Sequence, residues 1–314
     1  MRHNRFGLIG HPIAHSLSPA LFKAGYEGRY PYELIEGEDF ELSYRRFIEE
    51  DYAGINVTAP FKELAFAKAD ILSPECEAVG ATNLLVKTPQ GVKAFNSDFL
   101  GVRMWLEETT ADLLSGRSVT KRTPPIPIHP TMPCSLQKPT GLFVDRSRPH
   151  AARGVARFSY TDLPYSNNDS LSEELSVLIV GMGGAGKAAA ASGESLGMKV
   201  IRMNRTVRDE KTRPLEDFLE CFREADIIIY NIPTAIPDLN KLTDRDFNPG
   251  RPKFILEANY KNPSFDKALQ DKMQAANPLI RYTGGKTWLL YQAVTGYEIF
   301  TGEKPDLERM SDVL

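Results

Sequence analysis

The stretch SVLIVGMGGAG at residues 176–186 decides the fold class of this chain. It begins as a continuous apolar run, which is typical of a strand buried on both faces, and ends in a glycine-rich turn. An Ala-rich helix is expected over residues 184–197, and a second apolar run, KVIRMN at 199–204, follows it. A strand, a helix and a second strand at this spacing predict a parallel βαβ unit.

The glycines of this turn complete the pattern G-x-G-x-x-G of dinucleotide-binding domains. The first glycine permits the tight turn, the second lets the backbone approach a pyrophosphate, and the third allows close helix–strand packing. The helix N-terminus would then face the phosphate charge. The alternative is a turn that serves packing alone. We predict dinucleotide binding by Gly181, Gly183, Gly184, Ala185 and Gly186.

The end of the second strand indicates which dinucleotide is bound. An NAD site usually carries a carboxylate there, which accepts hydrogen bonds from the ribose 2′-hydroxyl. Here no carboxylate occurs before Asp209, whereas Asn204, Arg205 and Thr206 offer a guanidinium and a hydroxyl suited to a 2′-phosphate. NADP is therefore the predicted cofactor; in the alternative interpretation, Arg205 is only a solvated residue at a strand end.

The alternation of strands and helices extends in both directions from this unit. After it, strands are expected at 226–231 and 253–260, and helices at 214–225, 265–276 and 286–300. Before it, strands are expected at 6–10, 32–35, 54–59, 82–86 and 92–95, and helices at 19–25, 39–50 and 98–108, with a further helix that opens at Pro60. This pattern predicts an α/β protein of two domains, an N-terminal α/β domain with a largely parallel sheet and a C-terminal Rossmann-like, doubly wound domain.

The expected domain boundaries lie where this alternation of strands and helices stops. Residues 109–172 have no clear period and contain eight of the 22 prolines, so we expect a solvated insertion, or else a mobile segment that binds a partner. The nucleotide-binding domain is expected over 173–285, and the other domain over 1–108 together with the returning segment 286–314.

Composition excludes several classes of protein. The chain has 314 residues, which suits about two domains, and its formal net charge of −3 offers no general attraction for nucleic acid or an anionic membrane. Its three cysteines, at 76, 134 and 221, form no CxxC pair, so we expect a reducing cytoplasm and no disulfide framework. The N-terminal residues lack a signal-peptide apolar core, and no metal site is expected because no residue cluster has ligand spacing.

Four polar clusters lie at expected strand ends or helix starts, where α/β proteins bind ligands. They are HSLSP (15–19), NVTAPFK (56–62), GATN (80–83) and FNSD (95–98). Each cluster also has a purely structural interpretation. Serines at 16 and 18 and the aspartate at 98 are residues that cap helices, and the lysine at 62 is compatible with a solvated helix start.

Taken together, these clusters resemble the shikimate dehydrogenase family. The family's substrate-domain motifs are matched by GHPIAHSLSP, INVTAPFK, VGATN and FNSDFLG, and its cofactor-domain motifs by VGMGGAG and NRT. The YQA of residues 291–293 matches its C-terminal substrate helix. The resemblance covers nearly all of the chain outside the proline-rich segment.

The resemblance implies a small-molecule substrate and the reversible, NADP-linked reduction of 3-dehydroshikimate to shikimate in aromatic amino-acid biosynthesis. It places Lys62 and Asp98 on the family's catalytic pair. It also implies that Ser16 and Ser18 bind the ring carboxylate of the substrate. The other substrate-binding residues that it implies are Thr58, Asn83, Tyr260 and Gln292, and Gly285 is assigned to cofactor binding.

These residue types suit the chemistry. Charge develops on the carbonyl oxygen as a ketone accepts hydride, and an ammonium at Lys62 can stabilise that charge and donate the proton. The carboxylate of Asp98 can orient the lysine. A dehydrogenase that also accepts quinate or NAD, and a non-catalytic protein that binds shikimate-like ligands, are the alternatives.

The sequence departs from the family near the expected nicotinamide pocket. The changes lie in NIPTAIP (231–237), EANYKNPSF (257–265) and GGKTWLL (284–290). Trp288 replaces a methionine, and it is expected either to pack in the core or to stack on the nicotinamide.

Overall fold

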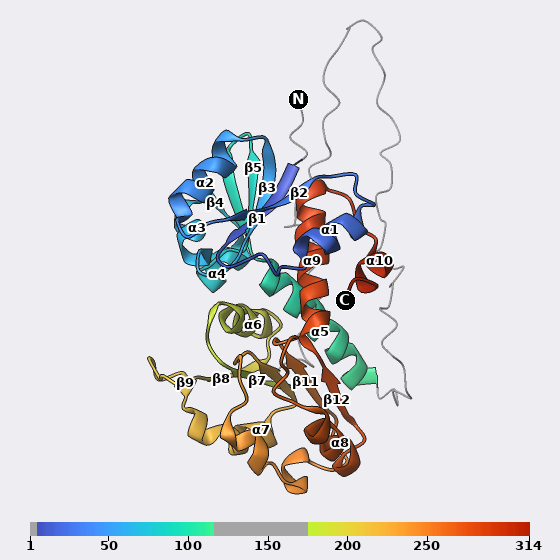
Figure 1. Cartoon of the computed structure of the whole chain (residues 1–314). Helices are drawn as coiled ribbons and strands as arrows, with labels where there is room; N and C mark the ends of the chain where they lie inside the picture. Colours follow the sequence, from blue (N-terminus) through green and yellow to red (C-terminus); the bar gives the residue numbers. More distant parts are fainter. Residues whose placement is uncertain (1–4, 116–174) are drawn as a thin grey trace, which may run out of the picture.

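The computed structural model describes residues 5–115 and 175–314, which form two α/β domains, each built on a six-stranded sheet (Figure 1). The predicted fold class is therefore confirmed. The cysteine at 134 and the rest of the predicted proline-rich segment up to residue 172 lie outside the described residues.

The sheet of the first domain has the strand order β2-β1-β3-β5-β6-β4. Its strands are β1 (Arg5–Gly10), β2 (Tyr32–Glu36), β3 (Tyr52–Val57), β4 (Ile71–Leu72), β5 (Leu84–Thr88) and β6 (Gly91–Phe95). β1 pairs in parallel with both β2 and β3, and only β5 runs against its neighbours. The chain leaves β1 for one side of the sheet and β3 for the other, so their carboxyl ends border a crevice.

Helices cover both faces of this sheet. They are α1 (Ser18–Gly25), α2 (Phe40–Glu49), α3 (Lys62–Lys68), α4 (Pro74–Val79), α9 (Gly285–Thr301) and α10 (Leu307–Ser311). α2 buries Phe40 and Phe47 against one face, and Phe61, directly before α3, joins the same cluster. α1, α9 and α10 pack against the other face through an aromatic cluster that includes Phe22 and Tyr297.

The second sheet has the order β12-β11-β10-β7-β8-β9, and all of its pairs are parallel. Its strands are β7 (Ser176–Val180), β8 (Lys199–Met203), β9 (Thr212–Arg213), β10 (Ile227–Tyr230), β11 (Lys253–Glu257) and β12 (Ile280–Thr283). Counted within this domain the order is 3-2-1-4-5-6, which is that of the Rossmann fold. The switch point, where a dinucleotide crosses the sheet, lies between β7 and β10.

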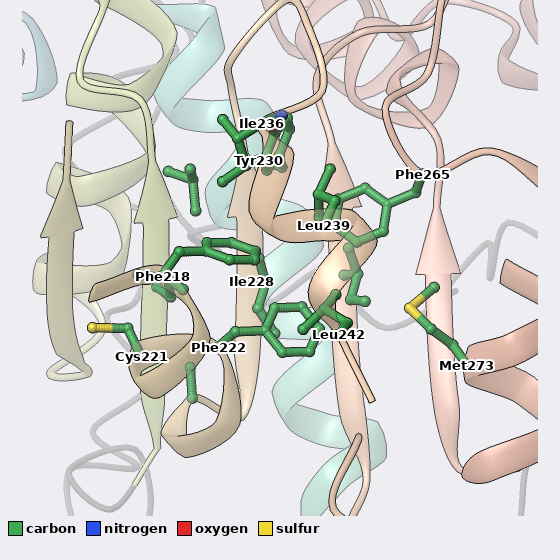
Figure 2. Packing of buried hydrophobic residues seen from close by; sticks show 14 of the residues in the cluster. Phe218, Cys221, Phe222, Ile228, Tyr230, Ile236, Leu239, Leu242, Phe265 and Met273 are labelled. Carbon is green, nitrogen blue, oxygen red and sulfur yellow. The ribbon is translucent and has the colours of Figure 1, made fainter. Parts of the chain in front are cut away.

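Two layers of helices enclose this sheet as well. On one face lie η2 (Leu215–Asp217), α7 (Phe218–Glu224), η3 (Pro237–Lys241), η4 (Asp244–Phe247) and α8 (Lys267–Ala276). They bury an apolar core that includes Phe218, Phe222, Leu239 and Met273 (Figure 2). Each such large apolar side chain contributes roughly 1.5–3 kcal/mol on burial. α6 (Gly184–Ser195) covers the other face together with α5 (Ser97–Ser115) and α9.

α5 and α9 join the two domains (Figure 1). Trp288 and Tyr291 of α9 pack on the second sheet, whereas Ala293 and Tyr297 of the same helix pack on the first. α6 also contacts the first domain, because Ser192 donates a hydrogen bond to the carbonyl of Phe99 at 2.9 Å. The two crevices therefore open toward a common region.

The structure corrects three local predictions. α5 continues to Ser115 rather than ending at 108, so the expected start of the insertion at 109 lies inside a helix. Thr109 is buried and Leu113 is partly buried, and both follow Trp105 at i, i+4 spacing. They therefore extend the helix face that Trp105 packs against the second sheet. The short elements β4, α4, β9, β12 and α10 are too brief for a period to reveal them.

The third correction concerns helix starts. α1 begins at Ser18 itself, with Leu17 at the N-cap position, so Ser18 is not the cap that the sequence suggests. α3 begins at Lys62 and not at Pro60. Both differences leave the polar side chain in the first turn of its helix, at the edge of the sheet.

Candidate active site

A cavity of about 250 Å³ lies at the carboxyl ends of β1 and β3. All eight residues that the sequence assigned to catalysis or substrate binding line it, although they come from six separate segments of the chain: Ser16, Ser18, Thr58, Lys62, Asn83, Asp98, Tyr260 and Gln292. The structure therefore brings this predicted set together, while the role of each residue stays a prediction.

The sheet topology explains the convergence. The serine loop follows β1, and Thr58 follows β3, at the two sides of the crevice. Asn83 reaches the same edge because β5 runs antiparallel to β3, so that its first residues lie beside the last residues of β3. The Val57 N–H donates to the Asn83 carbonyl at 2.8 Å.

Lys62 and Asp98 form an ion pair inside the cavity, from the Lys62 Nζ to the Asp98 Oδ2. Their side chains are 24% and 9% exposed, respectively. Asp98 lies in the first turn of α5, where the helix dipole favours a negative charge, whereas the same dipole disfavours Lys62 at the start of α3. The carboxylate offsets that unfavourable position and holds the ammonium in place.

The structure also decides whether Asp98 serves only as a helix cap. The side chain of Asn96 caps α5, because its Oδ1 accepts a hydrogen bond from the Phe99 N–H at 3.0 Å. The Asp98 carboxylate is directed to Lys62 instead. The cap-only interpretation of Asp98 is therefore wrong.

The two serines form a polar corner of the cavity. Their Oγ atoms lie 3.2 Å apart, and the Ser18 N–H also donates to the Ser16 Oγ at 3.2 Å. Tyr297 donates its hydroxyl to the Ser18 carbonyl at 3.1 Å, and burial raises the pKa of Tyr297, so it stays a neutral donor. Two adjacent hydroxyls can both donate to one carboxylate.

Gln292 reaches the cavity because α9 crosses α5 at close range. A Cβ on Gly101 of α5 would lie 2.6 Å from the backbone nitrogen of Gln292. No side chain fits at this crossing, so the glycine sets the distance between the helices.

Replacing Gly101 with alanine is expected to force α9 away from α5 and to lower the free energy of unfolding by about 1–3 kcal/mol. Urea denaturation measures this loss. Glu107→Ala, a change on an exposed part of the same helix, should shift stability far less. Equal stabilities for Gly101→Ala and the wild type would mean that the helix pair has room to relax.

Tyr260 enters the cavity from the loop that follows β11. The fully buried Glu257 carboxylate holds this loop by accepting hydrogen bonds from the backbone N–H groups of Ser264 and Phe265, and from the Tyr282 hydroxyl at 2.7 Å. The loop is thus fixed at its base, which places Tyr260 opposite the first domain.

The glycine turn has the geometry of a phosphate cradle. Gly181 has φ +95°, a conformation open to glycine but rarely adopted by other residues. A Cβ on Gly186 would lie 1.9 Å from the Gly181 carbonyl oxygen, so the turn and α6 pack as the motif predicts. A Cβ on Gly183 would meet nothing within 4 Å, which leaves open space in front of the backbone. Ala185 lies in the first turn of α6, partly exposed.

This turn lies beside the Lys62 side chain. A Cβ on Gly184 would be 3.9 Å from the Lys62 Cδ. Close by, Lys187 of α6 and Glu63 of α3 form an ion pair between the domains at 3.4 Å. The cradle and the Lys62–Asp98 pair therefore share one cleft.

The residues expected to select the cofactor follow β8. Asn204 accepts a hydrogen bond from the Met182 N–H at 3.4 Å and so ties the strand end to the glycine turn. Arg205 and Thr206 are exposed, where they can meet a ligand. Gly285 is buried at the start of α9, and a Cβ there would lie 2.2 Å from the Ala258 carbonyl oxygen, which is a packing reason for this glycine. Its cofactor contact stays a prediction.

Trp288 packs in the core. It is 4% exposed, belongs to the apolar cluster under the second sheet, and does not line the cavity. Its Nε1 donates to the Asp98 carbonyl at 3.4 Å. The structure therefore favours the packing interpretation over stacking on a nicotinamide.

Several further residues line the cavity without having been assigned a role from the sequence, among them His15, Asn56, Ser97 and Tyr297. The first three lie inside the quoted motifs, so the motifs pointed to them without a role. Tyr297 carries no such signal, because a helical tyrosine facing a cavity and one facing a core have the same spacing.

Within residues 5–115 and 175–314, no group of three or more His, Cys, Asp or Glu could hold a metal ion. No helix in those ranges is long and apolar enough to cross a membrane.

Comparisons with known proteins give a family match for each of the two domains. The family model of the shikimate dehydrogenase substrate binding domain matches residues 8–85, and that of the D-isomer specific 2-hydroxyacid dehydrogenase NAD binding domain matches residues 157–252. A shikimate dehydrogenase (NADP(+)) of Acidiphilium cryptum is 39% identical over 30% of this chain, and this match spans 36% of that relative's length. The next two relatives are likewise matched over only 43% and 38% of their lengths.

A full-length match comes from the shikimate dehydrogenase (NADP(+)) of Natronomonas pharaonis, which is 26% identical over 98% of this chain and 97% of the relative. Among solved structures, the shikimate 5-dehydrogenase of Thermus thermophilus in complex with NADP(H) and shikimate has a TM-score of 0.63 and is 22% identical, covering 98% of this chain and 97% of that chain. The quinate dehydrogenase of Corynebacterium glutamicum in complex with NAD has a TM-score of 0.66 at 19% identity, with the same coverage.

The fold is that of a two-domain α/β protein whose second domain is a Rossmann-like, dinucleotide-binding type. The matches to the substrate domain and along the whole chain make the assignment narrower. The chain is similar to shikimate dehydrogenases, over residues 8–85 to the family's substrate binding domain and, at 26% identity, along nearly its whole length.

Proposed function

We propose that the protein catalyses the reversible, NADP-linked reduction of 3-dehydroshikimate to shikimate, the reaction that the names of its relatives describe. The observation that carries this proposal is the Lys62–Asp98 ion pair in a polar cavity directly beside the glycine turn. A protein that only binds a ligand has no need for a paired ammonium and carboxylate at this place.

Substrate binding is assigned to both sides of the cavity. The hydroxyls of Ser16 and Ser18 suit the ring carboxylate, because their oxygens lie 3.2 Å apart and both can donate. Thr58, Asn83 and Gln292 supply further polar groups for the ring hydroxyls, and Tyr260 closes the cavity from the second domain.

Proton transfer is assigned to Lys62. In the reducing direction its ammonium donates a proton to the carbonyl oxygen as negative charge develops there. In the oxidising direction the neutral amine takes the hydroxyl proton. Asp98 holds the amine in position and accepts a hydrogen bond from a neighbouring hydroxyl. NADP(H), when held at the glycine turn, would supply or accept the hydride.

The residues present fit NADP. The positive φ of Gly181 and the open space before Gly183 allow a pyrophosphate to approach the backbone, and the N-terminus of α6 faces it. The exposed Arg205 guanidinium after β8 can pair with a 2′-phosphate.

Replacing Arg205 with alanine is expected to raise KM for NADP⁺ by about 10- to 100-fold, since a charge-assisted hydrogen bond contributes about 1.5–3 kcal/mol. KM for NAD⁺ should hardly change, because NAD⁺ has no 2′-phosphate. Arg208→Ala, in the same exposed loop, is the matched control. An unchanged preference for NADP⁺ in Arg205→Ala would assign the discrimination to other residues.

An absorbance assay with shikimate or quinate and NADP⁺ or NAD⁺ tests the proposed function. Turnover of shikimate with NADP⁺ supports it. Preference for quinate or NAD⁺ would indicate the broader dehydrogenase, and binding without turnover would indicate a non-catalytic protein.

We also propose a reducing cytoplasm as the place of action. Cys76 and Cys221 are buried and unpaired, and burial raises the pKa of the Cys76 thiol to about 12, so it stays protonated. Neither thiol has the character of a disulfide partner.

A further inference from the structure

We propose that Ser97 is a positioning residue that fixes the orientation of Asn83, so that Asn83 offers only N–H donors to the substrate. Both residues line the cavity and both are buried, with Asn83 6% and Ser97 1% exposed. This inference deepens the proposed function and rests on it.

The orientation follows from a donor that cannot reverse its role. The backbone N–H of Ser97 lies 2.7 Å from the Asn83 Oδ1. A backbone N–H only donates, so the atom facing it must be the carboxamide oxygen and not the nitrogen. The Asn83 amino group is then the part of the amide that remains for other partners.

The Ser97 hydroxyl completes the arrangement. Its Oγ lies 3.0 Å from the Asn83 Nδ2 and accepts one of the two amide hydrogens. The second hydrogen is left for the cavity. Asn83 therefore recognises a lone pair on the ligand, whereas the nearby Asp98 carboxylate recognises an O–H. A hydroxyl that accepts from one and donates to the other satisfies both residues.

The position of Ser97 suits this role. It is the first residue of α5, directly before Asp98, so one helix start orders the amide and carries the carboxylate. Gly296 of α9 lies opposite, and a Cβ there would be 3.3 Å from the Ser97 Oγ. The absence of a side chain at Gly296 leaves the hydroxyl free to turn toward Asn83.

Steady-state kinetics of Ser97→Ala test the inference. Ser97→Ala keeps the backbone N–H that faces the Asn83 Oδ1 but removes the hydroxyl that accepts from the Asn83 Nδ2. Losing this one neutral hydrogen bond is expected to raise KM for shikimate about three- to tenfold. The same change should leave kcat within about twofold and KM for NADP⁺ unchanged. Ser97→Thr keeps the hydroxyl and is expected to restore KM. Ser43→Ala is the matched control, because Ser43 is also a buried serine, donates to the Asp39 carbonyl and does not line the cavity.

A double-mutant cycle separates positioning from general packing. If Ser97 acts through Asn83, Ser97→Ala should add little to KM in an Asn83→Ala background. An undiminished effect in that background, or a wild-type KM in Ser97→Ala, would overturn the inference. Asn83→Asp keeps the shape but cannot donate, so it should raise KM more than Ser97→Ala does, and a wild-type KM would again count against the proposal. Absence of shikimate turnover in the wild type would instead refute the proposed function itself.

Discussion

Replacing Lys62 with alanine is expected to lower kcat by about 10²–10⁴, the range for a lost acid–base group, while the fold survives. The side chain is partly exposed at the cavity wall and supports no apolar core, so its removal leaves packing intact. What disappears is the group that exchanges a proton with the reacting oxygen. Circular dichroism should match the wild type, and the absorbance assay measures kcat.

Two further variants sharpen this test. Lys62→Arg keeps a positive charge beside Asp98, but a guanidinium does not release its proton, so kcat should stay low. Lys68→Ala removes a lysine from the last turn of the same helix, where it pairs with Glu41 outside the cavity. That control should turn over normally. A near-native kcat in Lys62→Ala would reject the assigned role.

Replacing Asp98 with asparagine is expected to lower kcat and also to raise KM for shikimate, with a combined loss in kcat/KM of about 10- to 100-fold. The substitution keeps the shape but removes the charge that holds Lys62 and the acceptor for a substrate hydroxyl. A hydrogen bond to a charged group contributes about 1.5–3 kcal/mol, which gives this range. KM for NADP⁺ should be unaffected.

The matched control for Asp98 is an aspartate whose only role is capping. Asp39 accepts hydrogen bonds from the Glu41 and Leu42 N–H groups at the start of α2. Asparagine caps a helix about as well as aspartate, so Asp39→Asn should change neither stability nor kinetics appreciably. If Asp98→Asn, like this control, had wild-type kinetics, the negative charge of the Asp98 carboxylate would not be needed for activity.

Local signals account for most of the fold prediction. Elements with a strong apolar pattern, such as β7, α6 and β10, lie within a few residues of the bounds that the sequence predicts. Short elements without such a pattern, such as β4 and α4, are not predicted, because their burial comes from neighbours distant in sequence. The extension of α5 belongs to the same class, since the second sheet buries its last turns.

The candidate site divides in a similar way. Residue types with a chemical reason to lie at strand ends, such as Lys62 and Asp98, could be named from their motifs. By contrast, the orientation of the Asn83 side chain, with its oxygen facing Ser97, depends on hydrogen bonds between residues 14 positions apart. No spacing rule predicts such a contact.

The glycine turn and the alternation of strands and helices were enough to predict a Rossmann-like domain and a second α/β domain, because backbone geometry and apolar periodicity are properties of short segments. That Asn96 and not Asp98 caps α5, that Trp288 belongs to the core, and that Gly184 lies beside Lys62 became apparent only in three dimensions. The physical reason is that each of these facts concerns the distance between atoms of separate segments, and the packing of α5, α6 and α9 between the two sheets sets those distances.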